Sequence, residues 1–187
     1  SMAQNAFANT SSSLMIGKLQ GVIDDLLMAP LSVLELLSAM VIGAVVRGLL
    51  IGMASIAVLM LIVHIPLSSV FVIVAFAVLG CMMLSLLGIF GGLWAEKFDH
   101  LAAITNFVVT PLTFLSGTFY SIDRLGGVWQ EIAYFNPFFY MIDGFRQGFL
   151  GRGDTDVMQG LFIMLAVNAI LFALCYGILK SGYKIKS

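Results

Sequence analysis

Residues 48–95 read GLLIGMASIAVLMLIVHIPLSSVFVIVAFAVLGCMMLSLLGIFGGLWA, a run without a single Asp, Glu, Lys or Arg. Shorter uncharged runs lie between Asp99 and Asp123 and between Asp156 and Lys180. A helix needs about 20 consecutive apolar residues to cross the hydrocarbon core of a bilayer. The long run is therefore sufficient for two crossings, and each shorter run for one. The sequence predicts an all-α, polytopic transmembrane helical bundle.

The composition supports a membrane protein. Apolar residues make up 60% of the chain, charged residues 10%, and the mean hydropathy is +1.05, whereas a soluble domain carries about 25% charged residues. The net charge is -1, and no basic patch with interleaved aromatic residues indicates a nucleic-acid partner. Cys81 and Cys175 both fall in the apolar runs, where a thiol behaves as a small hydrophobic group, so they define no disulfide framework.

Four segments are predicted to cross the membrane. Two polar breaks, residues 64–68 and 96–100, separate the first three of them. Pro111 lies inside the third and should kink it, because its nitrogen cannot donate to the preceding turn. The predicted spans are residues 33–63, 69–95, 101–122 and 157–179.

Residues 18–29 form a different kind of segment. Their apolar residues recur at i, i+3, i+4, i+7 and i+8, which is one face of a short helix, and Pro30 follows it. The opposite face carries Lys18, Gln20, Asp24 and Asp25, which is too polar to lie in lipid. The pattern alone indicates a helix that rests at the membrane surface.

Residues 128–150 contain two apolar stretches that are too short to cross. Asn136 is a preferred N-cap and Pro137 is tolerated at the first helical position, so a new helix should begin there. The result is a pair of re-entrant or interfacial helices. Their aromatic residues either anchor the pair at the interface or form a lid over an exit. The lid is favoured by Asp143 and Arg146, an i, i+3 pair that could latch against a partner chain.

The lysines predict the orientation of the chain, because short cytoplasmic loops carry excess Lys and Arg. With four crossings, one side receives all the cations of the short segments and is the cytoplasm. Those cations are Lys18, Lys97, Lys180, Lys184 and Lys186. The segment between Asp123 and Asp156 then lies outside, and residues 180–187 form a cytoplasmic tail.

The sequence lacks the motifs of several kinds of catalytic and binding sites. The chain has no Gly-x-x-x-x-Gly-Lys-Ser/Thr loop to hold a nucleotide, so any ATP dependence must come from a partner. It also lacks Gly-x-Ser-x-Gly. His64 and His100 fall at opposite membrane faces, with no second metal ligand nearby. The sequence therefore predicts neither an enzyme nor a cofactor site in this chain.

Arg47 is the most unusual residue within a predicted span, because a charge near the bilayer centre costs at least about 2.5 kcal/mol. It either lines a path for an anionic or polar headgroup, or pairs with an acid elsewhere in the bundle or dimer. Glu35 is not that acid, because the two lie about 18 Å apart along the helix axis.

Several stretches together resemble a known family. Residues 107–120 (FVVTPLTFLSGTFY), Trp129 and residues 136–146 (NPFFYMIDGFR) are similar to the signature of the ABC-2 type permeases, the membrane subunits of type-2 ATP-binding-cassette exporters. Residues 8–13 (ANTSSS), 24–30 (DDLLMAP) and 47–52 (RGLLIG) extend the resemblance over nearly the whole chain. Within the family it looks most similar to the small bacterial multidrug and lipo-oligosaccharide export permeases.

The resemblance implies a six-span subunit that forms a homodimer and binds two separate ATPase subunits, which hold ATP and Mg²⁺. Residues 18–29 would be the coupling helix, and residues 128–150 the extracellular gate. The family's first span and most of its second are missing, so residues 1–17 look like the end of span two. The implied gate residues are Trp129, Asn136, Pro137, Tyr140, Asp143 and Arg146.

The expected function is that of a permease subunit of an ATP-driven exporter in the bacterial inner membrane. Its substrate would be amphipathic: a drug, a lipid-linked molecule or a saccharide. Two other classes stay open. An ion-coupled carrier or channel usually shows inverted repeats and ionisable groups at the midplane, neither of which is visible here. A non-transporting membrane scaffold would leave residues 18–29 without an ATPase to contact.

Overall fold

The structure, a computed structural model, describes residues 2–20, 32–62, 67–95, 97–114, 116 and 134–181. Every element in these ranges is helical, which confirms the predicted all-α class. The elements are α1 (Met2–Leu19), α3 (Val33–Ile62), α4 (Val70–Trp94), α5 (Phe98–Ile104), the π-helical turn η1 (Thr105–Val109), α6 (Thr110–Phe114), α8 (Pro137–Leu150) and α9 (Val157–Ser181).

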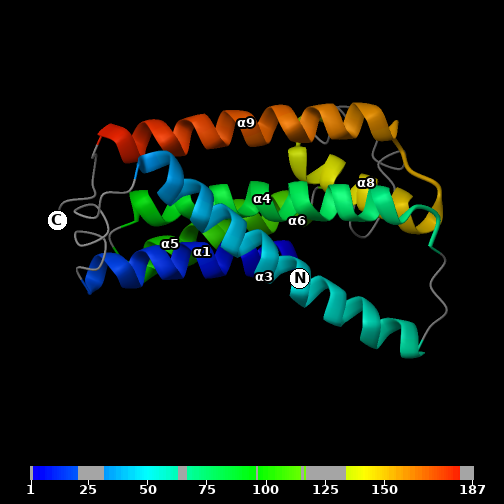
Figure 1. The fold of residues 1–187 in the computed structure, drawn as a ribbon, viewed down its shortest axis with the longest axis horizontal. Helices are drawn as coiled ribbons and strands as arrows, with labels where there is room; N and C mark the ends of the chain where they lie inside the picture. Colours follow the sequence, from blue (N-terminus) through cyan, green and yellow to red (C-terminus); the bar gives the residue numbers. More distant parts are fainter. Residues whose placement is uncertain are drawn as a thin grey trace.

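Helix α4 is the centre of the bundle. It contacts α1, α3, α8 and α9, and Figure 1 shows it between α9 on one side and α1 on the other, with α3 crossing obliquely. In the most apolar window of α4, 56% of the residues are buried, against 11% in α3 and 17% in α9. The outer helices therefore present most of their apolar surface away from the protein, as helices facing lipid do.

Three described helices, α3, α4 and α9, are long and apolar enough to cross a membrane by length and composition. They lie over three of the four predicted spans, and each end agrees to within two residues. The capping of α3 explains its start: Ser32 Oγ accepts from the Glu35 N–H at 3.2 Å, while the Glu35 carboxylate accepts from the Ser32 N–H at 2.8 Å. This reciprocal pair is a capping box.

The fourth predicted span, residues 101–122, is irregular in its described part. Helix α5 begins at Phe98, and the chain then forms the π turn η1 directly before Pro111. Thr110 donates both its N–H and its hydroxyl to the Thr105 carbonyl, five residues back. The kink predicted at Pro111 stays a prediction, but the π turn shows that the helical hydrogen-bond pattern is interrupted just before this residue. Residues 117–122 lie outside the described part.

The first helix, α1, is a core element. Ala6, Phe7 and Leu14 are buried. Helix α1 packs on α4 at two glycines, Gly88 and Gly92. A Cβ at Gly88 would lie 2.7 Å from the Phe7 carbonyl oxygen, and a Cβ at Gly92 would lie 3.1 Å from Leu14 Cβ. α1 ends at Leu19, so the first two residues of the predicted helix 18–29 belong to α1. Residues 21–29 lie outside the described part.

The aromatic ring of Phe76 joins three helices. It is 1% exposed and lies against Gly144 of α8 so closely that a Cβ there would enter the ring, while a Cβ at Gly160 of α9 would lie 3.0 Å from it. Further along α8, a Cβ at Gly148 would collide with Ile73. Because only glycine permits these approaches, α8 is seated deeply on α4.

Candidate functional site

The start of α8 is as the sequence predicts. Asn136 is the N-cap: its Oδ1 accepts from the Phe138 N–H at 3.0 Å, and Pro137 occupies the first turn. The nitrogen of the same amide makes a second contact, which the sequence did not predict. Asn136 Nδ2 donates to the Leu112 carbonyl in α6 at 2.8 Å. A backbone N–H can only donate and a carbonyl can only accept, so the two contacts fix the amide orientation.

Asp143 is the centre of a polar network at the end of α8. Its side chain is 1% exposed. Its Oδ1 accepts from Arg146 Nη2 at 2.6 Å and from the Asp154 N–H at 2.9 Å. Its Oδ2 accepts from the N–H and the hydroxyl of Thr155, at 2.9 and 2.7 Å. The predicted Asp143–Arg146 pair is therefore present, but it binds the loop of its own chain between α8 and α9.

Arg146 connects two carboxylates, because its Nη2 also lies 2.6 Å from Asp154 Oδ2. Partial burial by itself would lower the pKa of Arg146. The hydrogen bonds and negative charges of Asp154 and Asp143 outweigh burial and raise the pKa above its ordinary value. The guanidinium is thus permanently charged, and the three residues form an ion-pair network.

The backbone around this network is shaped by two glycines. Gly151 ends α8 with φ 68°, a left-handed conformation that favours glycine. A Cβ at Gly153 would lie 3.0 Å from Gln147 Cδ and 3.1 Å from Asp143 Oδ2. Gln147 adds a weak contact from Nε2 to the Thr155 carbonyl at 3.3 Å. The turn therefore closes tightly over the carboxylate.

The segment before α4 is attached to α8 as well. The N–H groups of Ser68 and Ser69 both donate to the Gly148 carbonyl, at 3.1 and 2.9 Å. Together with the glycine contacts of α8 on α4 and the Asp143 network to the start of α9, these bonds make the ends of α4, α8 and α9 one unit.

The aromatic residues of the predicted gate are partly core residues. Phe139 packs edge-on against Tyr134 with ring centroids 5.6 Å apart, and against Tyr140 at 5.1 Å. Phe138, Phe139 and Tyr140 are buried in the main core cluster. Burial, with a smaller contribution from Tyr134, raises the pKa of Tyr140. Trp129 lies outside the described residues, so its place in the predicted gate stays a prediction.

Arg47 has a different partner from the two that the sequence suggested. Its Nη1 donates to Asn9 Oδ1 of α1 at 2.6 Å, so the bond joins α3 to α1 through a neutral amide. The two roles predicted for Arg47, in a path or in an ion pair, stay predictions. Asn9 was missed because nothing in the spacing of the two residues, 38 positions apart, indicates that they meet.

The predicted coupling residues are only partly visible. Gln20 is exposed and donates its N–H to the Ile16 carbonyl at 2.9 Å. Asp24 and Asp25 lie outside the described residues, and the side chain of Lys18 does too. In the described ranges no group of three or more His, Cys, Asp or Glu could hold a metal ion.

A second polar residue that the sequence analysis missed is Asn168, in the middle of α9. It is 2% exposed, and its Nδ2 donates to the Leu79 carbonyl of α4 at 3.1 Å and to the Met164 carbonyl at 2.8 Å. Its Oδ1 is buried without a hydrogen-bond partner. The position of this amide inside an apolar run could have indicated that Asn168 contacts another helix, because such groups usually face protein rather than lipid.

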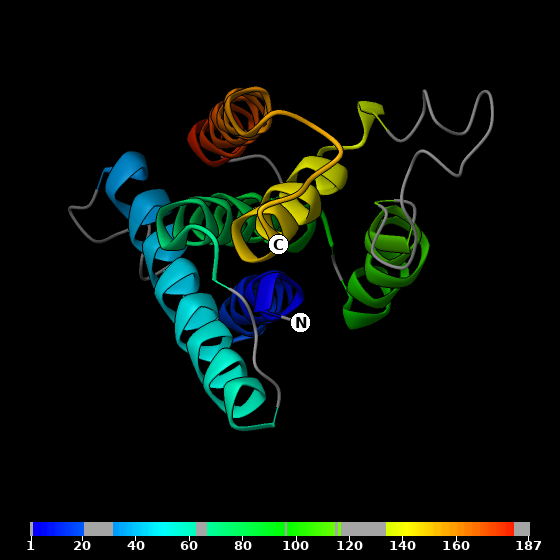
Figure 2. The ribbon, with the colours of Figure 1, turned by 90° about the vertical axis from the view of Figure 1, so that its right-hand side faces the viewer.

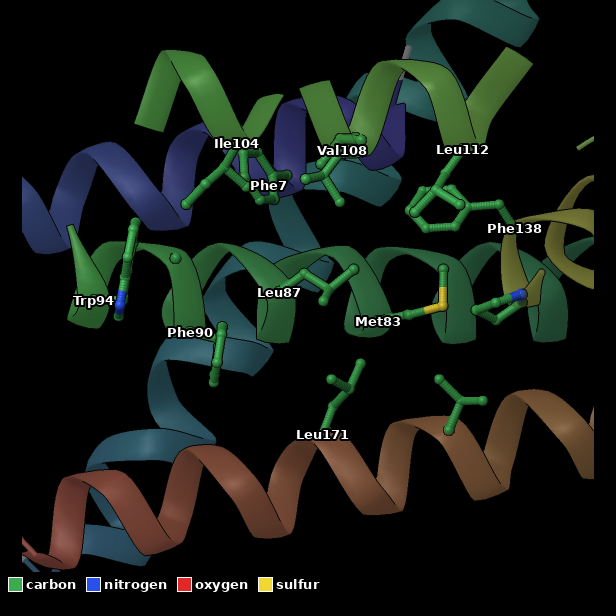
Figure 3. Close-up of a pocket in the computed structure, with 14 residues that line it drawn as sticks. Phe7, Met83, Leu87, Phe90, Trp94, Ile104, Val108, Leu112, Phe138 and Leu171 are labelled. Carbon is green, nitrogen blue, oxygen red and sulfur yellow. The ribbon is translucent and has the colours of Figure 1, made fainter. Parts of the chain in front are cut away.

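An apolar cavity of about 420 Å³ runs along α4. Figure 3 shows side chains from α4, from the α5–α6 region above it and from α9 below it, including Trp94, Leu87, Val108 and Leu171. This volume is within the range of small-molecule pockets, about 300–1,000 Å³. A smaller cavity of about 370 Å³ lies between α1 and η1 and includes the polar residues Gln4, Asn5 and Thr105.

Comparison with known proteins identifies the family of this chain. The sequence profile described as "ABC-2 type transporter" matches residues 1–150. The chain belongs to the ABC-2 type transporter family. It is 34% identical over its whole length to the inner membrane transport permease YadH of Escherichia coli K12 and covers 73% of that protein.

A further relative extends the comparison to another group of bacteria. Nodulation protein J of Rhizobium leguminosarum bv. trifolii is 32% identical over 106 residues, which cover 57% of this chain and 37% of that protein. No solved structure matches. As an ABC-2 family member with three helices suited to crossing a membrane, the chain is a multi-pass membrane transport permease rather than a catalytic enzyme.

Proposed function

We propose that this ABC-2 permease is the membrane subunit of an ATP-driven exporter for an amphipathic substrate. The observation that carries the proposal is the family match over residues 1–150, which contains all the described helices except α9. The geometry adds a central helix bundle and a polar network at the end of α8. Together they supply a spanning scaffold and a structured cap at one end of it.

Energy would come from a separate subunit. The chain lacks a phosphate-binding loop, and ABC-2 permeases in general are expected to work with an ATP-binding-cassette partner. That partner would bind ATP and Mg²⁺ and would dock on residues 18–29, with Lys18, Gln20, Asp24 and Asp25 on the polar face. α1, which leads directly into this segment, contacts α4 over much of its length. Movement of a docked segment would therefore reach the centre of the bundle.

Transport would take place in a homodimer. The substrate would leave between two copies, past the residues that begin and end α8: Asn136, Pro137, Tyr140, Asp143 and Arg146, together with Trp129. Binding and hydrolysis of ATP would shift the dimer between two states by differential affinity. The walls of the large cavity along α4 support the proposed substrate class. They consist of apolar residues, which suit the apolar part of a drug, a lipid-linked molecule or a glycolipid.

The protein would lie in the bacterial inner membrane with its C-terminus in the cytoplasm. The inner-membrane location is supported by the similarity to YadH. The orientation is supported by the lysines at positions 18, 97, 180, 184 and 186, which all fall on one side of four crossings.

The test begins with affinity purification of the full-length reading frame from its native membrane and mass spectrometry of the proteins that accompany it. The purified assembly is then placed in vesicles, and movement of a fluorescent phospholipid and of a cationic amphipathic dye is followed with and without ATP. We expect a stoichiometric ATPase subunit and ATP-dependent movement of at least one probe. A folded preparation that repeatedly lacks an ATPase, and that moves probes without ATP or not at all, would indicate a carrier or a scaffold instead.

A further inference from the structure

The segment α5–η1–α6 is the most loosely held part of the described bundle. Figure 2 shows it as the green helix that stands apart from the other helices. Among the described elements, α5 contacts α1 and α4, and α6 contacts α8. Of the residues of η1 only Val109 is buried, in the core cluster that includes Phe7 of α1 and Phe138 of α8. Between its two ends the segment is therefore supported mainly by this one side chain.

Open space lies on two sides of η1. The large apolar cavity borders Val109, and the smaller cavity borders Val109 and Thr105. Phe7 of α1 borders both cavities. Protein interiors normally contain few voids of this size. Apart from the packed side chain of Val109, the π turn can thus change its curvature into open space.

Helix α8, in contrast, is fixed. Phe76 is inserted against Gly144, the carbonyl of Gly148 accepts two N–H groups, and the buried carboxylate of Asp143 holds the loop that leads into α9. Each of these contacts would have to break before α8 could move relative to α4 or α9. Within this chain, α8 is accordingly held as one body with α4 and α9.

Asn136 connects the loose segment to this body. Its Nδ2 reaches the Leu112 carbonyl, while its Oδ1 caps α8. The Leu112 carbonyl is open to this bond because Ser116, four residues further on, donates its N–H to Thr113 instead. Leu112 follows Pro111 and η1, so the anchor is on the far side of the π turn from α5.

We propose that Asn136 is a positioning residue that anchors α6 to the unit formed by α4, α8 and α9, so that flexing of α5–η1–α6 is confined to its π turn. The consequence for transport rests on the proposed function, but the anchoring itself does not. The amide has two separable roles: its oxygen caps the N-terminus of α8, and its nitrogen restrains α6.

The two roles can be separated by substitution. Asp and Ser are N-cap residues as good as Asn, but neither can donate an amide N–H to the Leu112 carbonyl. N136D and N136S are therefore expected to preserve α8 and to release α6, and Ser covers the case in which the added charge of Asp prevents folding. Loss of one buried hydrogen bond should lower the ratio of docked to undocked α6 about tenfold.

The measurement is the distance between spin labels on the full chain in nanodiscs. Phe114 of α6, Leu150 of α8 and Leu165 of α9 are all exposed, so labels there disturb no core. Cys81 and Cys175 are fully buried and can remain. We expect N136D and N136S to broaden the distance distribution between positions 114 and 150 and to leave that between 150 and 165 unchanged. An unchanged 114–150 distribution in both variants, or equal broadening of the two pairs, would overturn the proposal.

A second arm uses the complex with its ATPase. A label at Phe107 of η1, which is 81% exposed, should change its distance to position 150 when ATP is added, whereas position 114 should not. In N136D position 114 should change too, and transport per ATP hydrolysed should fall while ATP hydrolysis continues. Movement of position 114 in the unsubstituted protein would contradict anchoring. If the first arm confirms anchoring but no probe is transported in an ATP-dependent way, the anchor stands and the exporter function is rejected.

Discussion

Thr155 donates both its N–H and its hydroxyl to one oxygen of Asp143, at 2.9 and 2.7 Å. The two residues are 12 positions apart, and the bonds bring the start of α9 onto the end of α8. Arg146 and the Asp154 N–H bind the other oxygen, so the described hydrogen bonds of the carboxylate all lie within its own chain. The network therefore holds the permease's own loop in shape.

This arrangement predicts the effect of neutralising Asp143. In D143N an NH₂ group replaces one acceptor oxygen and faces backbone N–H donors, and Arg146 loses a buried partner. Breaking a buried pair in this way should cost about 3 kcal/mol. The measurement is SDS-induced unfolding in mixed micelles. D156N is the matched control, because Asp156 is exposed in the same loop, and its change should stay within about 0.5 kcal/mol. Equal effects of the two substitutions would contradict the assigned role of Asp143.

The close contact of α8 with α4 predicts that Gly144 tolerates no side chain. In G144A the new methyl group would enter the Phe76 ring, and overpacking of this kind typically costs about 1–3 kcal/mol. G177A in α9 is the control, because a Cβ there meets nothing within 4 Å. It should leave stability unchanged or raise it by up to about 1 kcal/mol, since alanine favours a helix. The unfolding midpoints of the two variants should therefore move in opposite directions, or only the first should move.

The bond between Arg47 and Asn9 predicts that the two residues act as a pair. R47A and N9A should each lower stability by about 1 kcal/mol, the usual net value of one hydrogen bond. The double variant should lose no more than either single one, because only one bond exists to be lost. Additive losses would show that Arg47 acts through other contacts. Transport by the two single variants tells whether the bond is all that Arg47 supplies: a defect in R47A that N9A lacks would indicate a role in the path.

The coupling role proposed for residues 18–29 predicts a defect without loss of folding. Replacing Asp24 and Asp25 with lysine reverses the charge of the polar face that would contact the ATPase. We expect at least about a tenfold fall in ATP-dependent transport, which corresponds to about 1.4 kcal/mol of lost coupling, with normal expression and unfolding behaviour. The control is K184D, a charge reversal in the predicted cytoplasmic tail. Unchanged transport in the Asp24 and Asp25 variant would remove the coupling role from this helix.

Much of the fold could be predicted because its signals are local. The apolar segments and the polar breaks between them predicted the ends of α3, α4 and α9 to within two residues, and the Asn136–Pro137 pair predicted the start of α8. The prediction for residues 101–122 was less complete. Pro111 indicated a disturbed helix, but the choice of a π turn depends on Thr110 reaching back to Thr105, which no proline rule specifies.

The contacts missed by the sequence analysis are those between distant residues. Asn9 and Arg47, Asn136 and Leu112, and Asp143 and Thr155 each meet only after the helices have packed. The core position of α1 was hidden for a related reason. Its run of polar residues does not indicate a buried face, but the Thr10 hydroxyl donates to the Ala6 carbonyl within the helix at 2.5 Å, so that the residue can be buried against α4.

Asn168 has a consequence for how the protein is assembled in the membrane. Lipid offers no donors or acceptors, so the amide of Asn168 is poorly accommodated on an isolated α9. Besides the Met164 carbonyl of α9 itself, the amide donates to the carbonyl of Leu79 in α4, which is synthesised earlier and is already available when α9 emerges from the ribosome. Helix α9 therefore carries a polar group that favours its lateral association with α4. Because the chain is made in order, α4 and its Leu79 carbonyl are present before α9 enters the membrane.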